Sequence, residues 1–430
     1  MTTAQLPVPS TGPEAAVEFV AEHLDGLFSG PAAASERFRG GQSAADAAIA
    51  AYDVDRYANK RNEVFPPERR GASELSPYIR HNLLQLRRVW DHVGGGPGHD
   101  VRKFRDELLW QEYSRHWYAR LGTRTRTGVR RELDEARDAP MDDPSEGWDR
   151  SMACMELTVG ELHRDGWLVN QTRMWLSSDW SVRSGLRWQD GDDEFFRHLV
   201  DGSRAANRLG WQWTTGVGSS KHYGFSRYQV EKRAKGVCAG CDLRDDCPIQ
   251  SWPDDPTFVS VQRHDDVKGT PSEFAGPDGV EARGASGNGS GDDSSDDAGP
   301  GSEIDAVWIT AESLGDDDPA LTAHPDVPAV FVFDQPLLHR LQLSAKRLVF
   351  LTETLADLAE RRDVEIHLGT PGQALDGRSV AVTHAPVPGF ARHSAEVGPA
   401  ETHPFPWLAR PTTGSVSSFS AWRKGVSTPS

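Results

Sequence analysis

The sequence predicts a multi-domain protein of the α plus α/β class, with an all-helical domain followed by a parallel α/β domain. Helical periodicity dominates residues 1–262, a polar and acidic stretch covers 263–302, and strand-like and helical segments alternate through 303–430. A length of 430 residues also agrees with two or three domains rather than one. We therefore expect two folded domains that are joined by a linker.

The first 262 residues contain few strand-like runs. In residues 84–92 and 104–120, apolar side chains return every three or four positions, which is the spacing of one helix face. We expect helices in both segments and a helical fold for residues 1–262 as a whole.

Residues 263–302 differ in composition. They are rich in Gly, Ser and Asp, and no aromatic residue occurs between Phe274 and Trp308. Such a stretch cannot bury enough apolar surface to fold, so we expect a disordered acidic linker here.

The alternation of short apolar runs with helical patterns predicts a parallel sheet in residues 303–430. We expect one long amphipathic helix over 337–361 between the second and third strands. The expected strands are AVWIT (306–310), AVFVFD (329–334), VEIHLG (364–369) and SVAVTHA (379–385). This order is typical of a Rossmann-like domain.

The chain is acidic, with 64 Asp and Glu against 47 Lys and Arg and a net charge of −17. Only eight of the cations are Lys. Such a composition suits a halophilic protein, and it equally suits an ordinary acidic cytosolic one. Residues 114–131 are an exception, because they contain six Arg and no acid. This run is either a solvated helix face with its loop or a patch that binds nucleic acid.

No stretch of 18 apolar residues occurs, and the N-terminus lacks the basic start and apolar core of a secretory signal. We therefore expect a cytoplasmic protein with no membrane segment. We expect it to be a monomer.

Four cysteines are present, Cys154 followed by Cys238, Cys241 and Cys247 in a C-x2-C-x5-C pattern. Four thiolates are the number that a [4Fe–4S] cluster or an all-thiolate zinc site requires. Disulfides are rare in the cytosol, so the other reading is four ordinary buried cysteines.

Three segments carry polar groups at helical spacing. A Ser-rich turn at 71–76 leads into a helix start and suits a phosphate group. Glu107 and Trp110 share one helix face. Arg173 and Asp201 stand in separate helical segments, where a buried ion pair would favour a polar ligand between them. Each pattern alone also fits simple packing.

Four blocks occur in order: LSPYIRHN (75–82), ELLWQEYSRH (107–116), GWLVNQTRM (166–174) and VDGSRAANRLGWQW (200–213). Together they resemble the FAD-binding helical domain of the photolyase/cryptochrome family. Residues 303–430 resemble the α/β antenna domain of that family. Because the antenna domain usually comes first, the resemblance implies a circularly permuted chain.

The resemblance implies a set of FAD-binding residues, in which Arg173 and Asp201 pair beside the flavin ring and Asn207 faces its N5 atom. Ala72, Gln111 and Ser203 depart from the residues usual in the family. The cofactor-binding residues implied are Tyr57, Ser73, Leu75, Ser76, Gln111, Trp167, Asn170, Arg173, Asp201, Ser203 and Asn207.

The function implied is a light-driven DNA photolyase, a lyase in which reduced FAD passes an electron to a pyrimidine dimer in UV-damaged DNA. The alternative is a cryptochrome-like blue-light photoreceptor without repair activity. A third possibility is a degenerate flavoprotein that binds no flavin. The residues implied for lesion binding and catalysis are Glu107, Trp110, Asn170, Met174 and Trp213, and those for electron transfer are Trp211, Trp188 and Trp148.

The cysteine layout is similar to that of the iron–sulfur bacterial cryptochromes and photolyases. This favours a [4Fe–4S] cluster over zinc at Cys154, Cys238, Cys241 and Cys247. Glu312, Ser313 and Leu314 stand where basic residues are common in the antenna domain. The sequence therefore identifies no antenna chromophore.

Overall fold

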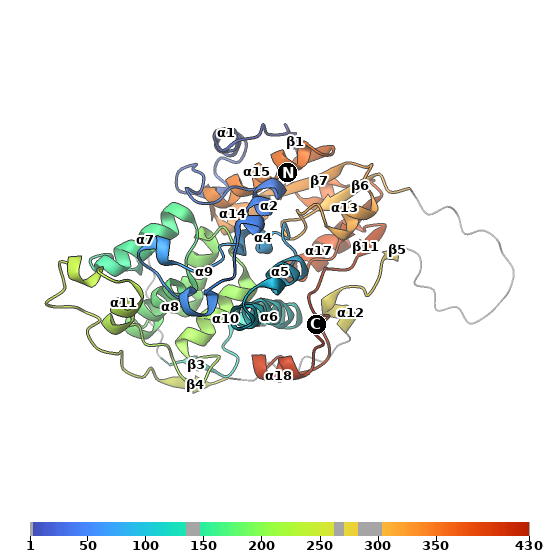
Figure 1. Ribbon diagram of the computed structural model, residues 1–430. Coiled ribbons are helices and arrows are strands. Elements are labelled where there is room, and N and C mark those ends of the chain that lie inside the picture. Colours follow the sequence, from blue (N-terminus) through green and yellow to red (C-terminus); the bar gives the residue numbers. More distant parts are fainter. Residues whose placement is uncertain (1–2, 135–146, 262–270, 283–302, 430) are drawn as a thin grey trace.

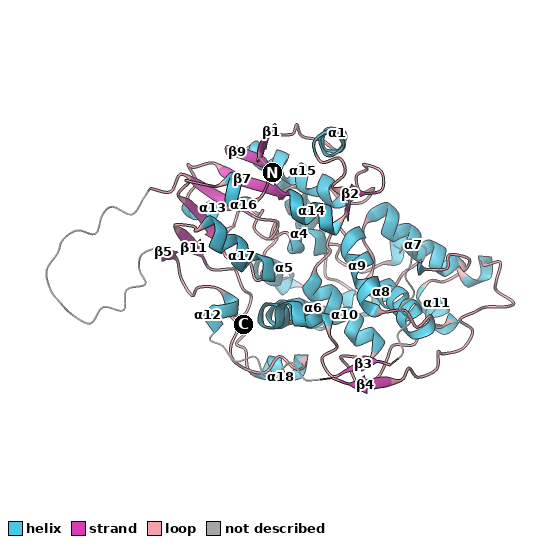
Figure 2. Ribbon diagram, turned by 180° about the vertical axis from the view of Figure 1, so that it is seen from behind, coloured by secondary structure: helices cyan, strands magenta, loops and turns pink. Residues whose placement is uncertain are grey.

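The computed structural model describes residues 3–134, 147–261, 271–282 and 303–429. It combines a helical part with an α/β part built on a sheet of mainly parallel strands (Figure 1). The strands of that sheet gather at one side of the molecule, and most helices of the first half lie at the other (Figure 2). In the described residues, no helix combines the length and apolarity that a membrane crossing requires.

The main sheet has seven strands in the order β1–β9–β7–β6–β10–β11–β5. The five central strands run parallel, and β1 and β5 pair antiparallel at the two edges. All residues of β6 and β10 are buried, as expected for parallel strands covered on both faces. The strands are β1 (Ala4–Leu6), β5 (Glu281–Ala282), β6 (Ala306–Ile309), β7 (Ala329–Asp334), β9 (Val364–Gly369), β10 (Val380–Thr383) and β11 (Glu401–His403). The four strands predicted from the sequence correspond to β6, β7, β9 and β10.

The helices of the α/β part correct one prediction. The single helix expected over 337–361 is two helices, because Gln342 adopts a left-handed conformation with φ 45° and ends the first of them. Between the two lies β8 (Leu343–Ser344), which pairs with β2 (Phe28–Ser29). The helices here are α13 (Pro319–Ala323), α14 (Gln335–Leu341), α15 (Ala345–Ala359), α16 (Pro371–Ala374) and α17 (Pro388–Val397).

The N-terminal segment packs against the α/β part. Besides β1 at the sheet edge, α1 (Pro13–His23) and α2 (Gln42–Ala51) both contact α15. Gly40 N–H donates to Glu353 Oε2 at 2.7 Å, and a Cβ at this glycine would lie 2.0 Å from the carbonyl oxygen of Phe350. The sequence placed this segment in the helical domain of residues 1–262. That domain division stays a prediction, but these contacts cross it.

The helical part surrounds α6, its longest helix. Helix α10 packs against three other helices, α6, α8 and α9. The helices predicted at 84–92 and 104–120 correspond to α5 and α6. The helices are α3 (Tyr57–Lys60), α4 (Ser76–Arg80), α5 (Leu86–His92), α6 (Gly98–Leu121), α7 (Ala153–Asp165), α8 (Asn170–Ser177), α9 (Trp188–His198), α10 (Arg204–Thr215) and α11 (Arg227–Arg233).

Part of the predicted linker is folded. Residues 271–275 form α12 (Pro271–Ala275), which contacts α6, and β5 follows at the sheet edge. Ala275 is fully buried and its carbonyl oxygen accepts a hydrogen bond from Trp407 Nε1 at 3.0 Å. The ranges 263–270 and 283–302 of the predicted linker lie outside the described residues.

Two smaller elements complete the fold. The strands β3 (Arg131–Leu133) and β4 (Phe258–Ser260) form an antiparallel pair beside the helical part. Near the C-terminus, α18 (Phe419–Lys424) packs against α6.

Candidate functional site

A large cavity lies between the helical part and the carboxyl ends of the central strands. Its volume is about 1340 Å³, which exceeds the roughly 300–1,000 Å³ of most small-ligand pockets. Residues of α6, α8 and α10 line one side of it, and residues of β6, β7 and α14 line the other. The cavity is therefore large enough for a ligand of the size of a dinucleotide.

Most site residues predicted from the sequence meet in this cavity. Apart from the four cysteines, three of them do not line it: Leu75, Trp148 and Trp188, all of which are buried. The predicted residues that line the cavity are Tyr57, Ser73, Ser76, Glu107, Trp110, Gln111, Trp167, Asn170, Arg173, Met174, Asp201, Ser203, Asn207, Trp211 and Trp213.

A buried ion pair joins α8 to the start of α10, as the sequence predicts. Arg173 Nη2 lies 2.7 Å from Asp201 Oδ2, and Arg173 Nε donates to the carbonyl oxygen of Leu168 at 3.0 Å. The side chain of Asp201 is only 4% exposed, yet its second oxygen, Oδ1, has no hydrogen-bond partner. Leaving a buried carboxylate oxygen unpaired is costly, so this atom is available to a ligand that donates a hydrogen bond.

Asn207 offers a second buried polar atom without a partner. Its side-chain amide nitrogen Nδ2 makes no hydrogen bond, and its backbone N–H donates to the carbonyl oxygen of Ser203 at 2.8 Å in the first turn of α10. The Ser203 hydroxyl caps this helix by accepting from the Ala206 N–H at 3.4 Å. Asn207 thus presents an amide to the cavity from a fixed backbone.

The Ser-rich turn leads into α4, as the sequence predicts. Helix α4 starts at Ser76, and Leu75 occupies the N-cap position without a side-chain cap. The Ser76 hydroxyl instead accepts a hydrogen bond from Trp167 Nε1 at 2.9 Å. The turn and the Trp167 indole are therefore held together at the cavity wall.

Positive charge dominates the cavity lining although the whole chain is acidic. Eleven arginines line the cavity against six acidic residues. Arg347 is one of these arginines, and burial together with the neighbouring Arg80 lowers its pKa to about 9. An excess of guanidinium groups suits a ligand with phosphate groups. The sequence analysis did not identify Arg347, because it lies in the α/β part, far along the chain from the four matching blocks.

The side of the cavity formed by α6 combines aromatic and acidic groups. Trp110 stacks on Phe419 of α18, with ring centroids 4.0 Å apart and planes inclined by 10°. Glu107 lies 2.9 Å from Lys103 Nζ and 3.4 Å from Arg61 Nε. Trp213 is 47% exposed at the cavity wall. Phe419, which the sequence analysis did not identify, covers one face of the Trp110 indole.

A chain of tryptophans leads away from the cavity. Trp211 contacts Trp180 edge to face at a centroid distance of 6.4 Å, and Trp180 contacts Trp148 at 4.8 Å. A Cβ at Gly191 would lie 2.1 Å from the Trp211 ring, so glycine is required for this packing. Trp188 is also buried, and it donates its indole N–H to Glu132 at 2.7 Å.

Trp180 was not among the predicted electron-transfer residues. It lies in the π-helical segment Ser178–Arg183 that follows α8, and only its contacts in three dimensions place it between Trp211 and Trp148. Its position in the sequence gives no sign of this.

The six arginines of residues 114–131 do not form one exposed run. Arg120 donates to the carbonyl oxygens of Thr412 and Gly414, and Arg131 donates to that of Gly216 at 2.9 Å. Of the others, Arg115 donates to the carbonyl oxygen of Ile79, Arg126 pairs with Asp193, and Arg124 and Arg130 are at least partly exposed. The structure thus corrects the picture of a continuous positive patch, because several of these guanidinium groups satisfy backbone carbonyls or an acid.

The four cysteines line a second, much smaller cavity, together with Met152, Val237 and Ile249. All four are free thiols, and the Ala153 N–H points to Cys241 Sγ at 3.4 Å. Burial and the three neighbouring thiols raise the pKa of Cys154 to about 12, so a nearby cation is needed to ionise it at neutral pH. The thiols therefore converge as ligands of a metal centre do.

The spacing of the four sulfur atoms is wide. In the part of the chain that the structure describes, no three of them lie within 4.8 Å of one another. A tetrahedral zinc ion with Zn–S bonds of about 2.3 Å would bring its sulfurs to about 3.8 Å apart. An iron–sulfur cluster separates its thiolates further, because iron and sulfide ions stand between them.

Comparison with known proteins matches the part of the chain that supplies most of the predicted site residues. The family described as the FAD binding domain of DNA photolyase matches residues 104–237. The deoxyribodipyrimidine photo-lyases of two strains of Thermus thermophilus are 32% and 33% identical over 190 and 191 residues, and each match covers 41% of this chain and 43% of the relative. The chain thus spans less than half the length of these relatives.

Two solved structures are similar to this chain over part of its length. The bacterial class III photolyase from Agrobacterium tumefaciens has a TM-score of 0.36 at 22% identity, covering 45% of this chain and 42% of that one. The Synechocystis sp. PCC6803 cryptochrome has a TM-score of 0.41 at 20% identity, covering 48% and 46%. Over residues 104–237 the chain thus matches the FAD binding domain of DNA photolyase, and the related photo-lyase sequences are similar to it over 41% of its length.

Proposed function

We propose that this protein is an FAD-dependent, light-driven photolyase that splits pyrimidine dimers in UV-damaged DNA. One observation carries the proposal: a single cavity contains the unpaired polar atoms suited to a flavin and also Glu107, Trp110 and Trp213, the residues suited to a damaged base. The related proteins are named deoxyribodipyrimidine photo-lyase, which agrees with this reading.

The residues of the cavity fit FAD. Asp201 Oδ1 accepts a hydrogen bond and Asn207 Nδ2 donates one, and both atoms are buried without partners. Arg173 holds the Asp201 carboxylate in place through an ion pair of 2.7 Å. The surplus of arginines offsets the charge of the diphosphate. When bound and reduced, FAD supplies the light-excited electron that opens the dimer.

On the substrate side, the chain binds and orients the flipped bases. The exposed ring of Trp213 offers a face for stacking, and Trp110 offers the face that Phe419 leaves open. Glu107 is held at the rim by Lys103 and Arg61 and accepts a hydrogen bond from a base edge. Asn170 and Met174 complete the wall from α8.

We propose further that the chain is circularly permuted. Numbered in chain order, the five parallel strands of the α/β part lie in the order 3-2-1-4-5 across the sheet, which matches the first five strands of a doubly wound, Rossmann-like sheet. This part follows the FAD-binding blocks along the chain, whereas the resemblance places it first.

For the cysteine cavity we propose a [4Fe–4S] cluster held by Cys154, Cys238, Cys241 and Cys247. The convergence of four free thiols supports a metal centre, and their wide spacing favours a cluster over a single zinc ion. The test is metal and sulfide analysis of protein purified without oxygen. About four irons and four sulfides per chain, lost in Cys247→Ser, support the cluster, and stoichiometric zinc without iron refutes it.

The alternative function is a photoreceptor without repair activity. It is favoured by the stacking of Phe419 on Trp110, which occupies one of the two faces that a flipped base would use. In that case, light changes the redox state of the flavin and the chain passes this change to a partner.

A repair assay separates the two functions. Full-length protein with FAD is mixed with DNA oligomers that contain either a cyclobutane dimer or a (6-4) photoproduct, in blue light and in darkness. We expect light-dependent loss of one lesion, strong reduction of this activity in Trp110→Ala, and no change in Trp252→Ala, whose exposed indole lies outside the cavity. Flavin photoreduction without repair of either lesion supports the photoreceptor and refutes the photolyase.

A further inference from the structure

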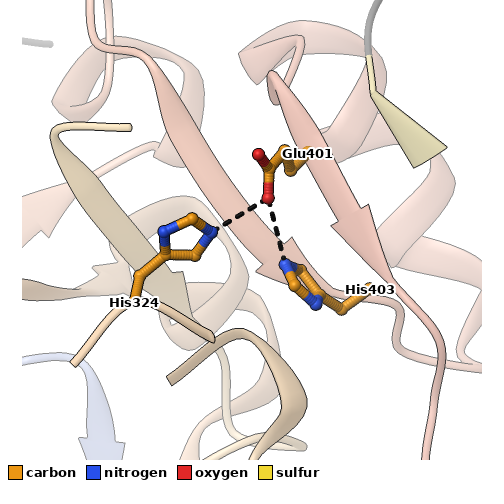
Figure 3. Close-up of side chains that lie close together, drawn as sticks. All are labelled: His324, Glu401 and His403. Atoms are coloured by element: carbon orange, nitrogen blue, oxygen red, sulfur yellow. Dashed lines mark hydrogen bonds and ion pairs between the residues drawn. The ribbon is translucent and has the colours of Figure 1, made fainter. Parts of the chain in front are cut away.

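Three side chains of metal-ligating types converge beside β11, the strand next to the β5 edge of the sheet, away from both the large cavity and the cysteines. Glu401 and His403 are two residues apart on β11, so they project from the same face of that strand. His324 directly follows α13, which packs against β11. Figure 3 shows the rings of His324 and His403 pointing toward the same carboxylate oxygen of Glu401.

The geometry of this group suits a bound cation. His324 Nε2 lies 2.9 Å from Glu401 Oε2, and His403 Nε2 lies 3.3 Å from the same oxygen. All three ligand atoms lie within 4.8 Å of one another. A tetrahedral ion with bonds of about 2.0–2.1 Å holds its ligand atoms about 3.3 Å apart. The side chains therefore need only small movements to bind such an ion.

One of the three residues is buried and the other two are partly exposed. His403 is buried, while the side chains of His324 and Glu401 are 20% and 29% exposed. The Nε2 atom of His403 is buried and makes no well-aligned hydrogen bond. The partly exposed residues leave a path for the ion and room for water.

We propose that His324, Glu401 and His403 bind a divalent transition-metal ion of the zinc type, with water at the fourth position. Two imidazoles and one carboxylate are a usual donor set for Zn²⁺ with an open position. The ion would tie the end of α13 to strand β11, two segments 77 residues apart in the sequence. Without an ion, His324 Nε2 is hydrogen-bonded to Glu401 Oε2 at 2.9 Å, and His403 Nε2 lies 3.3 Å from the same oxygen.

Cobalt(II) is the probe that tests this site, because its spectrum separates nitrogen and oxygen ligands from the thiolates of the cysteine cavity. Full-length protein is stripped with EDTA and titrated with Co²⁺ in anaerobic buffer. We expect visible d–d bands of a four-coordinate site without an accompanying sulfur-to-cobalt charge-transfer band. Zinc then displaces the cobalt and raises the melting temperature by mass action.

Variants assign the signal to these residues. We expect His324→Gln and Glu401→Gln, whose side chains are partly exposed, each to weaken Co²⁺ binding at this site at least tenfold while the circular dichroism spectrum stays unchanged. The control is His339→Gln, which removes an exposed histidine on α14. Thiolate-type cobalt spectra alone, or binding that is equal in His324→Gln and the wild type, would overturn the proposal.

Discussion

Replacing Asp201 by Asn tests whether the buried ion pair holds the cavity in shape for the flavin. Arg173 and Asp201 are 2.7 Å apart and their side chains are 21% and 4% exposed. Breaking a buried pair costs about 3–5 kcal/mol. Asn still offers a neutral oxygen to Arg173, and the Arg173 Nε bond to Leu168 remains, so we expect a loss of about 2–3 kcal/mol of unfolding free energy.

The same substitution affects cofactor binding. Asp201 Oδ1 has no partner in the protein, so a hydrogen bond from FAD to this atom would be one to a charged acceptor. Such a bond contributes about 1.5–3 kcal/mol, which corresponds to a tenfold to hundredfold change in the FAD dissociation constant. Urea unfolding of the FAD-free protein and titration calorimetry with FAD measure the two effects separately.

The control for this experiment is an ion pair of equal length on the surface. Arg87 Nε and Asp91 Oδ2 are also 2.7 Å apart, but both side chains are more than half exposed. We expect Asp91→Asn to cost about 0.3–0.5 kcal/mol and to leave FAD binding unchanged. If Asp201→Asn behaved like Asp91→Asn in both assays, the role assigned to the buried pair would be refuted.

Three further predictions concern the tryptophans, the C-terminal helix and a buried acid. Trp180→Phe slows photoreduction of bound FAD more than Trp188→Phe does, because Trp180 contacts both Trp211 and Trp148; equal rates in transient absorption would contradict this. Phe419→Ala frees one face of Trp110, so we expect it to bind UV-damaged DNA severalfold more tightly in a fluorescence titration. The control Ser420→Ala leaves this affinity unchanged. Weaker binding by Phe419→Ala would instead show that Phe419 belongs to the DNA-binding surface of the protein. Burial raises the pKa of Asp318 to about 7, so the folded state keeps a proton that the unfolded state releases near pH 4, and the wild type loses stability as the pH rises from about 4 through 7. Asp318→Asn removes this loss, which is on the order of 4 kcal/mol. In urea unfolding, the free energy of unfolding of Asp318→Asn relative to the wild type is therefore higher at pH 8 than at pH 5. The control Asp317→Asn, on the exposed side of the same turn, shows no such difference.

The sequence predicted those elements whose conformation depends on their own short stretch of residues. The central strands were recognisable because their apolar, β-branched runs are buried on both faces, as in AVFVFD of β7. The FAD-binding blocks were recognisable because several motifs occur in a fixed order, and the structure brings most of their residues to one cavity. Cys154 lies far along the chain from Cys238, Cys241 and Cys247, yet all four line one small cavity, as their number suggested.

Other features depend on contacts that sequence patterns do not encode. Strand β1 has three residues, and its place in the sheet comes from pairing Ala4 with Leu368. The break between α14 and α15 depends on one left-handed residue, Gln342. The ring stacked on Trp110 comes from Phe419, more than three hundred residues later in the chain. The arginines of residues 114–131 looked free because their backbone acceptors lie in other segments.

The central claim is that the large cavity holds FAD in a photoactive form. The most direct measurement is the absorption spectrum of the purified full-length protein with FAD, recorded without oxygen before and after blue light. We predict about one FAD per chain, with flavin bands near ~450 nm that bleach on illumination. A folded protein that retains no FAD after reconstitution, or whose flavin does not respond to light, would contradict the claim.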